Sequence, residues 1–201
     1  MKYILLEDIN KTIKDYLEEI YPDSDVNEIL KTAINILLKY LLDNNLQKEF
    51  KSYSGEYVGS GSYGILYRIS KDRLFKITTD KGEGIASKRI ENKNLEYVAH
   101  IYLCEKLDEE IYLIIREYGE PIKLSFKIKE IINRHPVDYD DIKEYLEKYK
   151  KYKIIRDIYN GLLELEKYGI KLTDIRDSNV MKFGNKYKIT DLGVLTMNIS
   201  P

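Results

Sequence analysis

A glycine-rich segment is the first feature whose residue types and spacing suit chemistry. The pattern G-x-G-x-x-G is filled by Gly59, Ser60, Gly61, Ser62, Tyr63 and Gly64. Backbone N–H groups in such a loop can cradle the phosphates of a nucleotide. Dinucleotide-binding proteins share this spelling, but there a helix follows the glycines directly. Residues 65–69 favour a strand instead, so the pattern indicates a loop between two strands that lies over phosphates.

Lys76 lies in a short apolar run, between Phe75 and Ile77, on the next expected strand. An ordinary lysine on a solvent-facing strand is the alternative, and without the upstream glycines it would be preferred. With them, Lys76 is a candidate phosphate-binding residue whose ammonium group needs a partner. We expect a carboxylate from the following helix, with Glu91 as the first candidate and Glu96 as the reserve. A solvated helix glutamate is the alternative for either residue.

A third group of polar residues follows near the end of the chain. Asp174, Arg176 and Asn179 lie within six residues, and Asp191-Leu192-Gly193 comes after an expected hairpin. Phosphoryl transfer needs a carboxylate that orients the attacking hydroxyl, which Asp174 can supply, and oxygen ligands for Mg²⁺, which Asn179 and Asp191 can supply. Arg176 can offset charge on the transferred group. Each residue alone is ordinary turn chemistry, but the order of the whole set favours a catalytic site.

The elements that must position these residues can be read from hydrophobic periodicity. Residues 3–20 and 29–41 predict two helices that form a hairpin. Short β-favouring runs then predict a three-stranded antiparallel meander over residues 57–77, a helix over 84–98, and a hairpin of strands at 100–107 and 111–117. The remaining chain predicts a short helix over 127–134, one long helix from Asp140 to Gly169, and strands at 180–182 and 187–189. The expected fold class is α+β.

Taken together, these motifs resemble the protein-kinase superfamily. The resemblance runs from the glycine loop at 59 to the Asp-Leu-Gly at 193, about two-thirds of the 201 residues. It implies a two-lobed fold with ATP in the cleft, a hinge near Glu117 that contacts the nucleotide, Mg²⁺ at Asn179 and Asp191, and Asp174 as the catalytic base. We therefore expect three parts: an N-terminal helical extension (1–50), a kinase-like N-lobe with an antiparallel sheet (51–119) and a reduced helical C-lobe (120–201).

The sequence also departs from the family pattern. Leu172-Thr173 replaces the usual His-Arg, Arg176 replaces the usual lysine, and Leu192 replaces phenylalanine. Only eight residues follow Gly193, so we expect no activation loop and no peptide recognition of the usual kind.

Three functions therefore stay open. The first is an ATP- and Mg²⁺-dependent phosphotransferase that acts on a protein or small-molecule hydroxyl. The second is a pseudokinase that binds a nucleotide or a partner without transfer. The third is transfer of AMP.

Composition limits the partners and the setting. The 33 basic and 34 acidic residues give a net charge of -1, which provides no electrostatic reason to expect nucleic acid. No apolar run approaches the roughly 20 residues of a membrane span. A single cysteine, Cys104, fits a reducing cytoplasm, and neither His100 nor His135 has a ligand cluster that predicts a metal site.

Overall fold

The computed structural model describes residues 4–22, 25–53, 55–61 and 63–193. Its central element is a five-stranded antiparallel sheet with strand order β1-β2-β3-β5-β4. The strands are β1 (Glu56–Gly61), β2 (Gly64–Arg68), β3 (Arg73–Thr78), β4 (Ile101–Lys106) and β5 (Tyr112–Glu117). The first three form the predicted meander, and the predicted hairpin of β4 and β5 joins it through β3. The combination of helices with an antiparallel sheet agrees with the expected α+β class.

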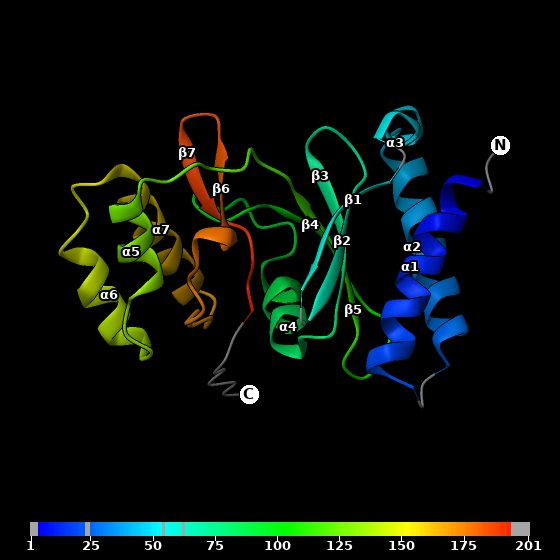
Figure 1. Ribbon diagram of the computed structural model, residues 1–201, viewed down its shortest axis with the longest axis horizontal. Coiled ribbons are helices and arrows are strands. Elements are labelled where there is room, and N and C mark those ends of the chain that lie inside the picture. The colour runs from blue at the N-terminus through cyan, green and yellow to red at the C-terminus, as the bar shows by residue number, and fades with distance from the viewer. Residues whose placement is uncertain (1–3, 23–24, 54, 62, 194–201) are drawn as a thin grey trace.

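Both faces of the sheet are covered, as Figure 1 shows. Helices α1 (Ile4–Ile20), α2 (Val26–Asp43) and α3 (Gln47–Tyr53) share one hydrophobic core with one face, to which β3 contributes Phe75 and Ile77. Successive side chains of a strand point to opposite faces. Lys76 therefore points to the other face, which explains how a lysine between two core residues reaches a polar site. The N-terminal helices pack against the sheet, as their apolar stripes predicted.

Helix α4 (Lys81–Ile90) lies against the opposite face of the sheet from the N-terminal helices. It begins earlier and is shorter than the predicted helix over 84–98. The Asp80 side chain caps its N-terminus by accepting a hydrogen bond from the backbone N–H of Glu83 (3.1 Å). It ends because Glu91 is extended and Asn92 adopts a positive φ of 57°. The later apolar residue Val98 instead joins the core from an isolated bridge with Ile189.

The C-terminal part is helical, with α5 (Phe126–Asn133), α6 (Tyr139–Glu147) and α7 (Lys153–Glu166). The prediction of one long helix from 140 to 169 was wrong, because residues 148–152 form a turn that separates α6 from α7. The two helices then pack against each other through one core that includes Ile142, Leu146 and Ile158. Periodic apolar spacing does not by itself reveal such a turn, since tyrosines within it remain packed against the core.

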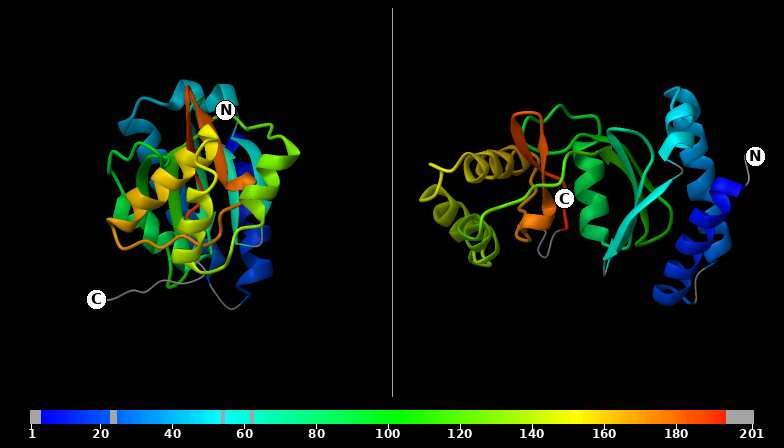
Figure 2. Two further views of the ribbon diagram at one scale, coloured as in Figure 1. Left: turned by 90° about the vertical axis from the view of Figure 1, so that its left-hand side faces the viewer. Right: turned by 45° about the horizontal axis from the view of Figure 1, so that its top comes forward.

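A short hairpin joins the helical part to the sheet. Strands β6 (Val180–Phe183) and β7 (Lys186–Ile189) form it, and a 3₁₀ turn at Asp177–Asn179 precedes it. In Figure 1 and in the right-hand view of Figure 2 this hairpin lies between helices α5–α7 and the region of α4. Bridges from Val98 to Ile189 and from Glu120 to Lys182 connect it to the sheet side. Within the described ranges, no helix is both long and apolar enough to cross a membrane.

Candidate active site

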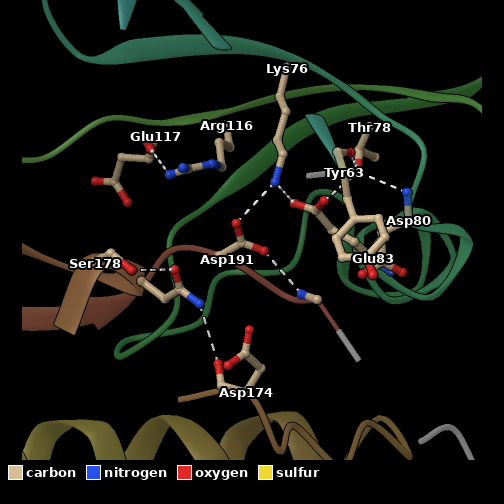
Figure 3. A network of polar contacts seen from close by, with 12 residues as sticks. Tyr63, Lys76, Thr78, Asp80, Glu83, Arg116, Glu117, Asp174, Ser178 and Asp191 are labelled. Atoms are coloured by element: carbon tan, nitrogen blue, oxygen red, sulfur yellow. Dashed lines mark hydrogen bonds and ion pairs between the residues drawn. The ribbon is translucent and has the colours of Figure 1, made fainter. Parts of the chain in front are cut away.

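The site is built around the ammonium group of Lys76. Lys76 Nζ lies 2.6 Å from Glu83 Oε1 and 3.0 Å from Asp191 Oδ2. Thr78 lies two residues after Lys76 on β3, and its Oγ1 donates to the second Glu83 carboxylate oxygen at 2.6 Å. Figure 3 shows Lys76 extending from the sheet toward both carboxylates. Strand β3, the start of the next helix α4 and the segment that follows β7, which is far away in the sequence, thus meet at one cation.

The expected partners of Lys76 were wrong. Glu91 follows the last residue of α4, where its carboxylate accepts from the Cys104 backbone N–H (2.8 Å) and pairs with Lys88 (2.9 Å). Glu96 pairs with Lys186. The reason is the position of the helix: because α4 starts at Lys81, its first turn faces Lys76, and Glu91 lies about 12 Å further along the helix axis.

The partner that the sequence interpretation missed, Glu83, had a recognisable signal. A residue of the N-cap type followed three positions later by glutamate is a sequence signature of a helix start. Asp80 and Glu83 have this spacing, and Asp80 is the N-cap. The Glu83 side chain does not complete a capping box, because the Asp80 N–H is bonded to Thr78 Oγ1 (3.2 Å) instead. The Glu83 carboxylate therefore binds the Lys76 ammonium group and the Thr78 hydroxyl group instead of the helix N-terminus.

Burial and neighbouring charge act together on these groups. Burial alone would lower the pKa of Lys76, but the carboxylates of Glu83 and Asp191 outweigh it, so the pKa is raised. Burial raises the pKa of Glu83 despite the nearby ammonium group. Burial alone would raise the pKa of Asp191, but the positive charges of Lys76 and Arg116 hold it below its ordinary value. Lys76 and Asp191 therefore stay charged across neutral pH.

The loop that follows α7 holds the second half of the site. Asp174 Oδ1 accepts from Arg176 Nε at 2.6 Å, and Asn179 Nδ2 donates to the Asp174 carbonyl oxygen at 3.3 Å. The loop is fixed from outside, because His135 Nε2 donates to the Ile175 carbonyl oxygen (2.9 Å). The Asn179 carbonyl oxygen accepts from the Thr190 N–H (2.8 Å), which keeps the loop next to Asp191.

The glycine loop is a hairpin between β1 and β2, as the sequence predicted. A Cβ atom at Gly64 would lie 2.8 Å from Lys76 Cε and 2.9 Å from the Ile77 carbonyl oxygen, so only glycine fits without movement. Gly59 and Gly61 face open space. Ser60 Oγ accepts from the Tyr57 hydroxyl group at 2.7 Å. Ser62 lies outside the described residues.

One cavity of about 450 Å³ connects the two halves, a size suited to a small ligand. The glycine loop contributes Gly61, Tyr63 and Gly64, the sheet and α4 contribute Leu66, Lys76, Asp80 and Glu83, and the C-terminal loops contribute Asp174, Arg176, Ser178, Asn179, Asp191 and Gly193. Asp80, like Glu83, had not been singled out from the sequence. Glu91 does not line this cavity. Nor does the Glu117 side chain, which pairs with Lys188 at 2.7 Å.

The residues fit Mg²⁺ that arrives with a nucleotide. Asp191 and Asn179 supply hard oxygen donors at one wall of the cavity. Over the described part of the chain, no group of three or more His, Cys, Asp or Glu side chains has the arrangement of a metal site. Mg²⁺ commonly uses one or two carboxylates and completes its shell with water and substrate phosphates, and Asp191 with Asn179 provides such a partial set of ligands. Asn179 and Asp191 are thus the residues that would hold it.

A larger groove of about 1020 Å³ is lined by a different set of residues. Its walls include Glu117–Pro121 and the β6–β7 hairpin. Its cations are largely neutralised by carboxylates, since Lys188 pairs with Glu117 and Lys186 pairs with Glu96. The glycine loop and Asp174 lie away from it, and size alone does not make it the reactive site.

Comparison with known proteins gives little further guidance. No family model matches the chain, and no curated protein matches it. Among solved structures, a match is the crystal structure of Rad53 1-466 in complex with AMP-PNP, with a TM-score of 0.45 and 18% sequence identity. The match covers 69% of this chain but 37% of that chain.

Proposed function

We propose that this chain is a Mg²⁺-dependent phosphotransferase that moves the γ-phosphoryl group of a nucleoside triphosphate to a hydroxyl group of a protein or small molecule. ATP is the nucleotide that the sequence resemblance implies. The observation that carries the proposal is the convergence of the glycine loop, the Lys76–Glu83 pair, Asp174, Asn179 and Asp191 on one cavity.

Each wall of the cavity has a part in the proposed reaction. The glycine loop and Lys76 hold the phosphates, and Glu83 keeps the Lys76 ammonium group in place. Asn179 and Asp191 hold Mg²⁺, which when bound neutralises charge on the phosphates. Asp191 keeps its charge for this purpose because Lys76 and Arg116 offset the effect of burial on its pKa.

Asp174 is the proposed general base. The acceptor oxygen bonds to the γ-phosphorus, the bond from that phosphorus to the bridging oxygen breaks, and the hydroxyl proton passes to the Asp174 carboxylate. Arg176, which lies 2.6 Å from Asp174 Oδ1, is exposed enough to reach the transferred group as its charge redistributes. The acceptor itself enters from the side where Asp174 and Arg176 border the cavity.

The test separates nucleotide binding from transfer. Mg²⁺ with ATP or GTP should raise the melting temperature of the wild-type protein, and Asp191→Asn should remove the shift. With γ-labelled nucleotide, the wild type should label itself or an acceptor in a lysate, and Asp174→Asn should stop transfer while the shift remains. Asp177→Asn is the matched control, because Asp177 lies in the same loop but pairs with Lys129 and does not line the cavity.

Three results would contradict the proposal in different ways. No shift with either nucleotide would reject the nucleotide site. A shift without labelled product would leave a nucleotide-binding module without transfer. Label that is incorporated only from α-labelled nucleotide would identify AMP transfer.

A further inference from the structure

Thr78 is a fully buried residue of β3 that contacts the walls of the cavity without lining it. Its Oγ1 lies 2.6 Å from Glu83 Oε2 and 2.9 Å from the Tyr63 carbonyl oxygen. The same oxygen accepts from the Asp80 backbone N–H at 3.2 Å. Tyr63 belongs to the glycine loop, whereas Asp80 and Glu83 belong to the start of α4. One hydroxyl group thus joins the glycine loop to α4, and Figure 3 shows these residues close to Lys76.

The Thr78 hydroxyl group has one proton for two acceptors. The Glu83 carboxylate and the Tyr63 carbonyl group both accept, so the proton forms a three-centre bond or alternates between them. The Tyr63 carbonyl oxygen has a second donor, the Thr79 N–H at 2.8 Å, which keeps it at the end of β3. A change at either acceptor therefore changes the hydrogen bond that is available to the other.

The same junction fixes the Lys76 side chain relative to the glycine loop. Gly64 follows Tyr63 and pairs with Thr78 in the sheet. It packs so tightly that an added Cβ atom would lie 2.8 Å from Lys76 Cε. Glu83 holds the Lys76 ammonium group with one carboxylate oxygen and contacts Thr78 with the other. The position of the ammonium group under the loop therefore depends, through Glu83, on the Thr78 hydroxyl group.

We propose that Thr78 is a positioning residue, whose hydroxyl group holds the glycine loop and the Lys76–Glu83 pair in one alignment for transfer of the γ-phosphoryl group. The inference rests on the proposed phosphotransfer and refines it. A misplacement of about 1 Å can lower the rate of a reaction about a hundredfold. Because Thr78 does not line the cavity, loss of its hydroxyl group should lower kcat rather than the affinity for the nucleotide.

The experiment compares Thr78→Val with Thr78→Ser. Valine keeps the shape of threonine without the hydroxyl group, and serine keeps the hydroxyl group. With saturating γ-labelled ATP and Mg²⁺, single-turnover transfer should fall at least about tenfold in Thr78→Val and stay within about threefold of the wild type in Thr78→Ser. The Kd of fluorescent methylanthraniloyl-ATP in Mg²⁺ should change by less than about threefold in both variants. Circular dichroism checks that each variant is folded at the assay temperature.

Thr173→Val is the matched control. Thr173 is also a buried threonine, 6% exposed, but its hydroxyl oxygen has no hydrogen-bond partner in the described structure. Its replacement should leave kcat within about twofold of the wild type, because no hydrogen bond is lost. A loss of transfer as large as that of Thr78→Val would overturn the proposal, since the effect would then not depend on the contacts of Thr78.

The remaining outcomes separate this inference from the proposed function. If the wild type transfers no phosphoryl group, the proposed function fails and this inference fails with it. If the wild type is active, only this inference fails when Thr78→Val keeps its kcat, when serine does not restore a lost kcat, or when the defect is confined to nucleotide binding. Should Thr78→Val not fold, Thr78→Cys takes its place, because a thiol is only a weak donor, and must show the same loss of kcat.

Discussion

Lys76 and Glu83 form a buried ion pair, with Nζ and Oε1 2.6 Å apart, although they are separated by only seven residues in the chain. The pair joins the last part of a strand to the first turn of the helix that follows. Both side chains are nearly excluded from solvent, with 6% and 3% of their surface exposed. Breaking a buried pair by removing one charge is strongly destabilising, so this contact must matter more than any exposed pair in the molecule.

The first prediction compares Glu83→Gln with Glu91→Gln. Glu83→Gln removes the charge that holds the Lys76 ammonium group. It should weaken Mg²⁺-nucleotide binding and lower kcat, so that kcat/KM falls by at least about tenfold. Glu91→Gln should change neither by more than about twofold, because an amide oxygen can still accept from the Cys104 N–H. Titration calorimetry and initial rates measure both. Equal effects of the two changes would contradict the assignment of Glu83.

The second prediction concerns the glycine loop. Gly64→Ala places a methyl group against Lys76 Cε and the Ile77 carbonyl oxygen and should lower the free energy of unfolding by about 1–3 kcal/mol. Gly61→Ala, whose added methyl group meets nothing within 4 Å, should stay within about 0.5 kcal/mol of the wild type. Urea denaturation measures both. A Gly61→Ala protein as unstable as Gly64→Ala would show that the loop packs differently.

The third prediction concerns Arg176. Its side chain is 65% exposed, so its ion pair with Asp174 adds little to stability. Arg176→Gln should therefore leave the melting temperature and the nucleotide Kd unchanged but lower kcat, by about tenfold to a hundredfold, because it removes a donor from the transferred group. Single-turnover assays distinguish this from a binding defect. An unchanged kcat would remove Arg176 from the reaction.

The fourth prediction concerns Cys104, which is fully buried in β4. Burial raises the pKa of its thiol to about 12. Because the thiolate is the reactive form, iodoacetamide should leave the native protein unlabelled at pH 8 and again at pH 9, and should label it fully in denaturant.

The sign of the pH effect on stability follows from the same shift. A pKa raised in the folded state stabilises it below the ordinary thiol pKa, and this contribution is lost as the pH rises through about 12. With one cysteine in the chain, mass spectrometry gives an unambiguous count of labelled molecules. Native labelling at pH 8 would show that β4 opens.

The hydrophobic pattern was sufficient for the sheet, and residue types and their order selected four candidates that share one cavity. Short apolar runs separated by turn residues gave the meander, and its alternation explains why Lys76 points away from Phe75 and Ile77. Lys76, Asp174, Asn179 and Asp191, singled out from their types and order, line one cavity. Local rules sufficed here because turns and strand alternation depend on neighbouring residues.

Helix boundaries were less accessible from periodicity. Because of its apolar spacing, the helix predicted over 84–98 extended past Asn92, where α4 has already ended. In the same way the spacing predicted one helix where residues 148–152 separate α6 from α7. In both places the chain leaves the helix while its apolar side chains stay in the core. The apolar side chains are then buried although the backbone is no longer helical, so hydrophobic periodicity does not mark the end of the helix. The capping pattern of Asp80 and Glu83 was the better local signal.

The sequence by itself determined which residue types are available for phosphate, metal and proton chemistry, and that a strand must follow the glycine loop. Only the tertiary structure decided their partners. Glu83 rather than Glu91 holds Lys76, and Arg116 lies beside them, because the start of α4 and the end of β5 lie on the same face of the sheet as Lys76. Which charges meet in a buried site depends on how distant segments pack, and that information is not contained in the spacing of any one segment.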